Sequence, residues 1–379
     1  MEADKYWEGK MKKIILLMIV LLYSLTVFSG NVKAAEKKSG KYRYEVLNKK
    51  KKTVAVTRVS KVSATVKIPK KIKGYTVVQI GRMKNVKEDT AENMDISGCI
   101  FSEDDTGRVK EIKLPDSLRK IGARALKNCK NLKKIDFPKG LRYIGTRAME
   151  KCCKIKKVVL PKELKKIGNR AFYYCESMEK AVFKTNKATI GEYAFATWPV
   201  SEGGTGHLKQ VNFPITYKGK IMDFAFAGYC GKTFTWVNFT ADNGAFLKNL
   251  GQIKTLQVHK KAKKVDIPRH CLDACAKQLE IKVPKNVKRV YIGQQEYNIK
   301  QVTLYGMDTK LEGDYSMGVG DEHNMISVET VKCKKKSTAW EMAKGYLCPD
   351  FTNVDWEKIN DDMYTEDNID FKKVKLVVL

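Results

Sequence analysis

Histidine is scarce in this chain, whose 379 residues include 4. The four are scattered, and no Ser-His-Asp, His-Glu-x-x-His, Cys-His or paired-carboxylate arrangement accompanies them. A glycine-rich phosphate loop is also missing. These absences argue against catalysis and predict no catalytic residue, no cofactor and no metal ligand. A secreted hydrolase is the least favoured of the alternatives.

Acidic residues are few compared with basic ones. The chain has 42 Asp and Glu against 73 Lys and Arg, which gives a formal net charge of +31. Such an excess attracts anionic partners. No nucleic-acid-reading module is visible, so nucleic acid is expected to bind only through non-specific charge attraction.

Long apolar runs are absent beyond one near the start. It extends from Ile14 to Phe28, which is shorter than the ~20 residues that a membrane span needs. Lys12 and Lys13 precede it, and Val32-Lys33-Ala34 follows it with small residues at the usual cleavage positions. This order is typical of a secretory signal peptide, which we expect to cover residues 1–34 and to be removed on export.

Signals for anchoring are also missing. No Cys follows the apolar run, as a lipoprotein would require, and Val374–Leu379 contains neither a Leu-Pro-x-Thr-Gly motif nor a hydrophobic tail. We therefore expect a secreted, extracellular protein, associated with a cell surface without a covalent or transmembrane anchor. Met1 and Met11 both remain open as the start of translation.

What the sequence has in abundance is internal repetition. Cysteine recurs every 23 residues in the middle of the chain, and so does the pair Ile-Gly. The cysteines are Cys129, Cys152 and Cys175, and the pairs begin at Ile121, Ile144 and Ile167. A fixed period of this size is typical of a solenoid, in which each unit becomes stable only by stacking on its neighbours.

Each copy reads apolar-x-x-apolar-x-apolar-Pro, a spacer, and then Ile-Gly-x-x-Ala-Phe-x-x-Cys. The alternation predicts a short strand with every second side chain inward, so that Asp136 lies outward. Pro ends the strand because it has no N–H to donate, and Gly is expected to allow a turn that a residue with a Cβ resists. The predicted inward residues of the three clearest copies are Ile112, Leu114, Ile135, Phe137, Val158 and Leu160.

This pattern resembles the BspA-type leucine-rich repeats of bacterial cell-surface proteins, over residues 60–305. The resemblance implies an α/β repeat solenoid, namely a leucine-rich-repeat-like right-handed coil with a parallel strand layer. An N-terminal β-hairpin cap and a C-terminal cap would close its ends. The resemblance also implies an adhesin or a binding protein for host or matrix proteins, with no catalytic residues to carry over.

The expected organisation follows from where the repeat begins and ends. It consists of the signal peptide 1–34, a β cap with a first variant repeat at 35–81, an insertion at 82–107, the solenoid 108–305 and a C-terminal capping region 306–379. Within the last region, Ser337–Gly345 is predicted to be a capping helix. The oligomeric state and the source remain open.

The 10 cysteines of an exported chain suggest disulfides, but the repeat offers another explanation. Cys129, Cys152 and Cys175 occupy equivalent inward positions, where a free thiol serves as a small buried hydrophobe. Cys333 and Cys348 remain open as a disulfide or as free thiols. His270, Cys271 and Cys275 suggest zinc, but the repeat already places both cysteines in the core, so no metal is predicted.

Positive charges recur with the same period and should form columns when the copies stack. Stacked like charges repel, and a bound anion would relieve the repulsion. The predicted polyanion-binding residues are Lys133, Lys134, Lys156, Lys157, Arg124, Arg147 and Arg170. The four lysines belong to the strand side, whereas the three arginines flank the Ile-Gly turn and belong to a second face. The alternative is a solvated surface that serves only solubility.

The sequence therefore predicts an extracellular non-enzymatic binding or adhesion protein that presents a basic repeat surface. Its expected partners are a host or matrix protein, or an anionic cell-wall polymer or glycosaminoglycan. The alternative function is a wall-associated structural protein, held by cationic attraction to anionic cell-wall polymer.

Overall fold

The computed structural model describes residues 35–83, 98–197, 207–214, 216–222, 224–236, 240–241, 253–267, 272–293, 298–314, 326–350 and 370–379. The predicted signal peptide, residues 84–97 of the predicted insertion, and Cys271 lie outside this part. The chain divides into two units, Met1–Glu36 and Lys37–Leu379.

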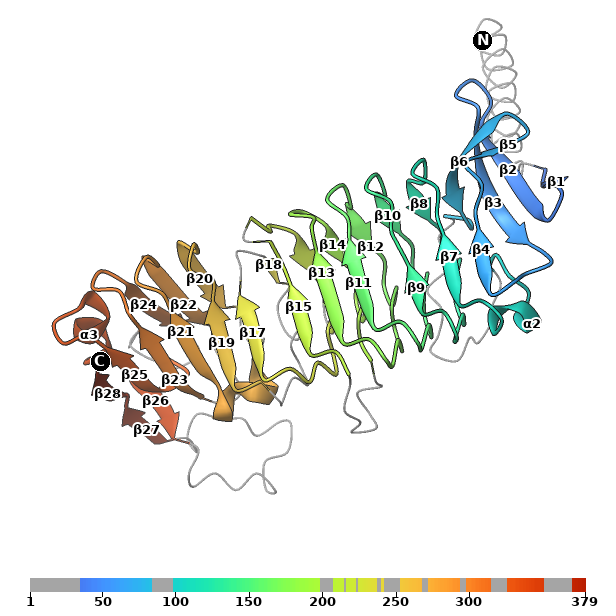
Figure 1. Cartoon of the computed structure of the whole chain (residues 1–379). Helices are drawn as coiled ribbons and strands as arrows, with labels where there is room; N and C mark the ends of the chain where they lie inside the picture. Colours follow the sequence, from blue (N-terminus) through green and yellow to red (C-terminus); the bar gives the residue numbers. More distant parts are fainter. Residues whose placement is uncertain are drawn as a thin grey trace, which may run out of the picture. The chain divides into compact units, whose positions relative to one another are not determined.

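The second unit begins with the predicted β-hairpin. Its strands β2 (Tyr42–Asn48) and β3 (Thr53–Val59) pair antiparallel, and β1 (Lys37–Ser39) extends the sheet at β2. Strand β3 then pairs parallel with β6 (Tyr75–Ile80), which also pairs antiparallel with β5 (Lys71–Ile72). The hairpin thus leads directly into the repeats (Figure 1).

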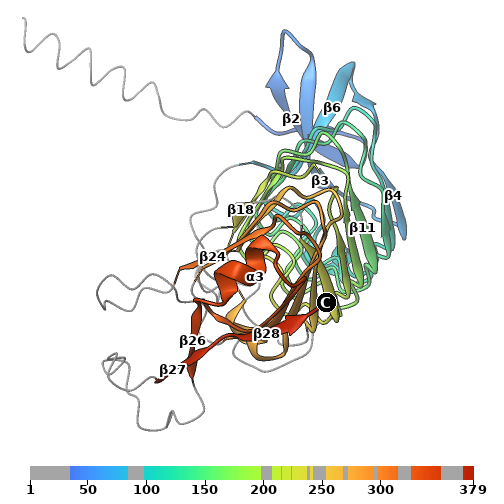
Figure 2. The same cartoon turned by 90° about the vertical axis from the view of Figure 1, so that its left-hand side faces the viewer.

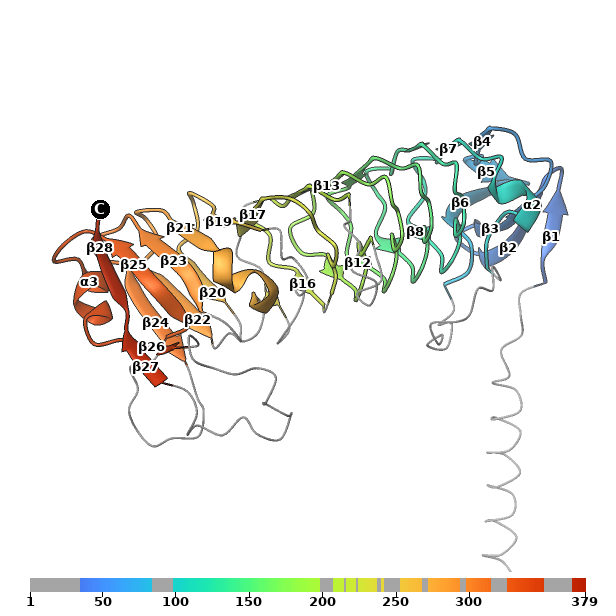
Figure 3. The ribbon, with the colours of Figure 1, turned by 90° about the horizontal axis from the view of Figure 1, so that it is seen from below.

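Each repeat contributes one short strand to each of two layers, which lie on opposite sides of the stack in Figures 2 and 3. The first layer contains β4 (Thr65–Lys67), β7 (Glu111–Lys113), β9 (Lys134–Ile135), β11 (Lys157–Leu160), β13 (Lys180–Phe183), β15 (Gln210–Asn212), β17 (Thr233–Trp236), β19 (Thr255–Val258), β21 (Glu280–Val283), β23 (Ile299–Leu304), β25 (Val328–Cys333) and β28 (Lys375–Val378). Within this layer every pairing is parallel.

The second layer is built from the Ile-Gly part of the repeat. It continues from β6 through β8 (Lys120–Ile121), β10 (Tyr143–Ile144), β12 (Lys166–Ile167), β14 (Thr189–Ile190), β16 (Lys220–Ile221) and β18 (Thr240–Ala241). A separate parallel sheet of β20 (Lys264–Ile267), β22 (Arg289–Gly293) and β24 (Lys310–Asp314) follows. Two parallel layers stacked copy upon copy make a repeat solenoid, as predicted.

The remaining elements are small. They are α2 (Glu103–Thr106), the 3-10 helix η2 (Asp273–Gln278), α3 (Thr338–Ala343), and the antiparallel pair β26 (Leu347–Asp350) and β27 (Asp370–Lys373). The predicted C-terminal helix is therefore present as α3, and the Ser337 side chain caps it by accepting from the Trp340 N–H. Part of the predicted insertion belongs to the fold, because Ile100 and Phe101 are buried in the core.

We call residues 109–131 coil 1, residues 132–154 coil 2 and residues 155–177 coil 3. The predicted inward side chains of these coils face the core. Ile112, Ile135, Val158 and Leu160 are buried, whereas Leu114 and Phe137 are half-buried and pack against the same cluster. Asp136 is exposed, as the alternation predicted. The frame of the repeat is therefore correct.

The reason for the repeated glycine differs from the predicted one. Gly145 and Gly168 are not among the residues with positive φ, and the left-handed positions are Arg147 at φ 54° and Arg170 at φ 55°. A Cβ on Gly168 would instead lie 2.5 Å from the Thr146 nitrogen of the preceding coil. The glycine is needed because two backbones approach closely, and the turn is made two residues later.

The third side of each coil is a turn that also hydrogen-bonds along the stack. Alternate N–H groups of coil 2 donate to carbonyls of coil 3, as from Met149 to Ala171 at 2.8 Å. Toward coil 1, the Cys152 thiol donates to the Leu126 carbonyl at 3.3 Å. Cys175 repeats this bond to Met149 at 3.3 Å. The recurring cysteine therefore supplies a weak donor as well as a small buried side chain.

Among the cysteines whose side chains the structure describes, Cys129, Cys152, Cys153, Cys175 and Cys333 are free thiols, so Cys333 forms no disulfide with Cys348. Burial raises the pKa of the Cys152 and Cys175 thiols. Burial also raises the pKa of Cys153, but this residue is only half-buried. The thiolate is the reactive form, so these thiols should differ mainly in access.

Native-state labelling with iodoacetamide is therefore expected to modify Cys153 well before Cys152 and Cys175, which are both 0% exposed. Peptide mass spectrometry at increasing labelling times measures the order. Labelling in denaturant is the control, and there the three rates should converge. Equal rates in the native protein would contradict the buried column.

Candidate functional site

The first strand layer is interrupted between β9 and β11, and again between β15 and β17. The Lys133 N–H donates to Lys110 at 2.8 Å, and the Glu179 N–H donates to Lys156 at 2.8 Å. Lys156 is the counterpart of Lys133 and Glu179, but within residues 98–197, which are described without a gap, its N–H makes no bond to Lys133. Strands β4, β7 and β9 accordingly form one sheet, and β11, β13 and β15 another.

The second layer is continuous at the same level. Tyr143 and Ile144 of β10 pair with Lys166 and Ile167 of β12. The two coils therefore stay joined on one side while their main chains do not bond on the other. This makes an opening on the first layer, which we call the β9/β11 groove.

The β9/β11 groove has a volume of about 660 Å³. Its lining comes from three successive repeats: Ile135, Asp136, Phe137, Lys139, Lys157, Val159, Pro161, Lys162, Glu163 and Lys184. Ile135 and Phe137 are inward residues of the alternation, whereas Asp136, Lys157 and Val159 are outward ones. The groove thus reaches from the surface to the edge of the core.

The rim of the groove is mainly cationic. Lys139, Lys157, Lys162 and Lys184 are all exposed. Two carboxylates, Asp136 and Glu163, also line it. Within the gap-free stretch 98–197, no ion pair or side-chain hydrogen bond neutralises any of the four lysines. The groove therefore combines an apolar floor with positive charge that is open to an anion.

The structure places the four predicted strand-side lysines together on the first layer. Lys133, Lys134, Lys156 and Lys157 are exposed, and Lys157 lines the groove. Within residues 98–197 one ion pair involves them, between Lys134 and Glu111 at 3.7 Å, and it lies in solvent with 64% of the lysine side chain exposed. An exposed pair of this kind contributes little. The predicted column of positive charge is thus present.

The predicted arginines require a correction. Arg124 and Arg147 are 2% and 5% exposed, so they are not on a surface that a polymer can reach. Arg147 pairs with Glu150 at 3.2 Å, and Lys127 reaches the same carboxylate at 3.8 Å. Both arginines are buried together with Glu150, whose carboxylate lies beside them. They stabilise the turn side and are removed from the candidate contact surface.

Burial shifts the pKa values of the cations in this internal cluster. Desolvation, followed by the charge of Arg147, lowers the pKa of Arg124. Desolvation also lowers the pKa of Lys127, although Glu150 opposes it. Three cations thus surround the carboxylate of Glu150, which makes that residue important for stability.

Arg170, the third predicted arginine, is half-buried among aromatic rings. Its guanidinium lies 5.6 Å from the ring centre of Tyr173 and 5.4 Å from that of Tyr193. Contacts of this kind hold a cation without a carboxylate. Arg170 therefore belongs to the packing of the turn side and lies on a different face from the groove.

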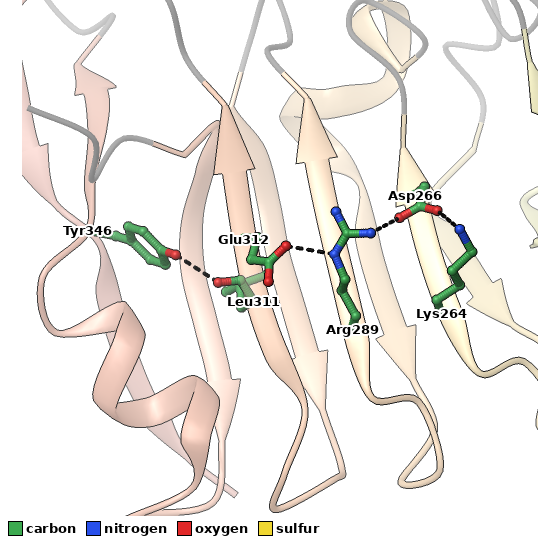
Figure 4. Close-up of polar contacts among 6 residues, drawn as sticks. All are labelled: Lys264, Asp266, Arg289, Leu311, Glu312 and Tyr346. Carbon is green, nitrogen blue, oxygen red and sulfur yellow. Dashed lines mark hydrogen bonds and ion pairs between the residues drawn. The ribbon is translucent and has the colours of Figure 1, made fainter. Parts of the chain in front are cut away.

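In the C-terminal repeats, opposite charges on neighbouring strands form ion pairs, as Figure 4 shows. Arg289 of β22 bridges Asp266 of β20 at 3.1 Å and Glu312 of β24 at 2.6 Å. Lys264 extends the chain to Asp266 at 2.6 Å. The pKa of Arg289 is raised, chiefly by its hydrogen bond to Glu312. Opposite charges alternate and pair here, whereas the charges around the groove are mainly positive.

The sequence prediction missed Lys139, Lys162 and Lys184. Lys139 and Lys162 each follow the strand-ending proline and are separated by one period, so this signal was available. The interruption between β9 and β11 left no such signal, because coils 2 and 3 match the template equally well.

No group of three or more His, Cys, Asp or Glu is placed to hold a metal ion in the described part of the chain. In the same part, no helix has both the length and the apolar character to cross a membrane.

Comparison with protein families identifies the repeats. The model described as "BspA type Leucine rich repeat region" matches residues 95–203 in six copies. This segment, which contains the β9/β11 groove, is a BspA-type leucine-rich repeat region. A comparison with curated proteins gives no match.

Several solved structures are similar to this chain at low identity. The T. pallidum leucine-rich repeat protein is 21% identical, with 62% of this chain and 86% of that one covered and a TM-score of 0.41. The pneumococcal vaccine antigen PcpA is 14% identical over 81% and 89% of the two chains, with a TM-score of 0.41. A leucine-rich cell surface protein from Faecalibacterium prausnitzii is 12% identical over 81% and 93%, with a TM-score of 0.39.

Proposed function

We propose that this is a secreted or surface-associated binding protein without enzymatic activity, which holds anionic ligands on the first strand layer of coils 2 and 3. The observation that carries the proposal is the β9/β11 groove, with four exposed lysines on its rim that no ion pair within residues 98–197 neutralises. Its ligand would be an acidic protein of a host or matrix, an anionic cell-wall polymer or a glycosaminoglycan.

The charge arrangement supports binding over a purely solubilising role. Lys157 pairs in register with Lys180 across β11 and β13, so two positive charges stand on adjacent strands about 5 Å apart. Like charges at that distance oppose folding. The Lys264–Asp266–Arg289–Glu312 chain shows that this protein neutralises neighbouring charges elsewhere. A bound anion would do so on the first layer.

The test reverses four charges together. The Lys133→Glu, Lys134→Glu, Lys156→Glu and Lys157→Glu variant is expected to lose retention on heparin and on purified teichoic polymer, because attraction between exposed charges is screened beyond about 8 Å. The wild-type protein should elute steeply with rising salt. Circular dichroism checks folding, which should be unchanged because all four side chains are exposed.

A matched control carries the same change of charge on the same layer, far along the chain. It consists of Lys254→Glu, Lys282→Glu, Lys285→Glu and Lys300→Glu, all at exposed positions. Retention of this control should stay close to wild type. If both variants elute with wild type, the lysines serve solubility only and the proposed function fails.

A further inference from the structure

We propose that the β9/β11 groove binds an extended peptide segment in which acidic residues bracket an apolar side chain. This rests on the proposed function and names the ligand of the same site. Three features of the groove lead to it: its apolar floor, the positions of its lysines, and the main-chain groups at its edges.

The floor of the groove needs an apolar partner. Ile135 is 7% exposed, whereas its counterparts Ile112 and Val158 are 2% and 1% exposed. Phe137 is half-buried, and its ring packs edge-to-face on Phe172 with centroids 6.3 Å apart. Val159 and Pro161 complete the floor. A ligand that carried charge alone would leave this surface in water, whereas an apolar side chain would cover it.

The lysines lie at both ends of this floor. Lys157 begins β11, and Lys162 follows the proline that ends it. At about 3.3 Å per residue their backbones are about 16 Å apart. Lys139 and Lys184 also follow the strands of their repeats, so they lie at the same end of the groove as Lys162. A ligand with one charged head, such as a fatty acid, would engage only one end.

An extended peptide meets this spacing directly. Acidic residues four or five positions apart span about 13–16 Å in an extended chain. The apolar side chain between them would then lie over Phe137 and Val159. Asp136 and Glu163 on the same rim disfavour a uniformly charged polyanion at the centre of the groove, because they would repel it.

Main-chain groups at the interruption also suit a peptide. The Lys156 N–H and the Lys133 carbonyl lack, within residues 98–197, the inter-coil bond that their counterparts make. Peptide ligands commonly add to an open strand edge through such groups. A peptide backbone offers both donors and acceptors to them.

The test uses fluorescein-labelled synthetic peptides and the full mature chain, with anisotropy measured at about 150 mM salt. The first peptide has two acidic residues on each side of a central phenylalanine. The second has the same composition with all acidic residues at one end. The third replaces the phenylalanine by serine. We expect the first to bind at least about tenfold more tightly than the other two.

Matched variants locate the site. Lys157→Glu with Lys162→Glu should weaken binding of the first peptide by at least about tenfold. The control is Lys282→Glu with Lys285→Glu, in which Lys285 likewise follows the strand-ending proline. Its strand β21 is paired on both sides, so no interruption is present there. The control should bind like wild type.

Different failures have different meanings. Equal binding of the three peptides, or equal loss in the two variants, would overturn the inference and leave general attraction to anions. Displacement of the first peptide by dodecanoate but not by an unlabelled copy of itself would also overturn it, in favour of an amphiphile. In each case retention on heparin that depends on the four strand-side lysines would still support the proposed function.

Discussion

Replacing Gly168 by alanine is expected to lower the free energy of unfolding by about 3 kcal/mol, because the site has no room for a methyl group. The new Cβ would lie 2.5 Å from the Thr146 nitrogen and 2.7 Å from the Gly145 carbonyl carbon. Both are backbone atoms of the preceding coil and cannot move aside as a side chain would. Coils 2 and 3 would have to separate along the second layer, where Ile144 and Ile167 are paired.

Gly107→Ala is the matched control for this prediction. Gly107 has a right-handed φ of −69°, and an added Cβ would meet no atom within 4 Å. Its replacement should leave stability unchanged or raise it by up to about 1 kcal/mol, because alanine restricts the unfolded chain. Urea unfolding followed by circular dichroism measures both variants. Similar midpoints for the two would show that the coils do not approach as closely as described.

Replacing Glu150 by glutamine should also destabilise the protein strongly, by about 3–5 kcal/mol. The side chain of Glu150 is 5% exposed and neutralises Arg147 and Lys127, which are themselves buried. Glutamine keeps the shape and removes the charge, so the cations would remain buried beside a neutral group. Breaking a buried pair by removing one partner is costly for this reason.

Glu179→Gln provides the control for the loss of one carboxylate. Glu179 is exposed, and its side chain makes no ion pair in the described part of the chain. Its replacement should change stability by less than about 0.5 kcal/mol. A second comparison uses Glu150→Gln combined with Lys127→Met, which removes one of the stranded charges. Recovery of stability in that double variant is expected. Its absence would show that the cluster does not act through charge.

The sequence by itself determined the frame of the repeat. A strict period places equivalent residues on top of one another, so the alternation of Ile135, Asp136 and Phe137 was enough to assign their directions. The same argument assigned the buried cysteines, and the hairpin followed from two alternating runs around a lysine-rich turn. These patterns are local and recur unchanged in each stacked copy. A single sequence is therefore enough to recognise them.

The tertiary structure alone decided how the coils meet. Glycine after isoleucine could be recognised, but the close approach of Gly168 to Thr146 depends on the neighbouring coil. The burial of Arg124 and Arg147 depends on Glu150, which occurs in one copy only and forms no periodic pattern. The interruption between β9 and β11 arises between two copies with equally good sequences. A repeat sequence specifies each coil, whereas the spacing and hydrogen bonding between successive coils depend on contacts between neighbouring copies that one copy does not contain.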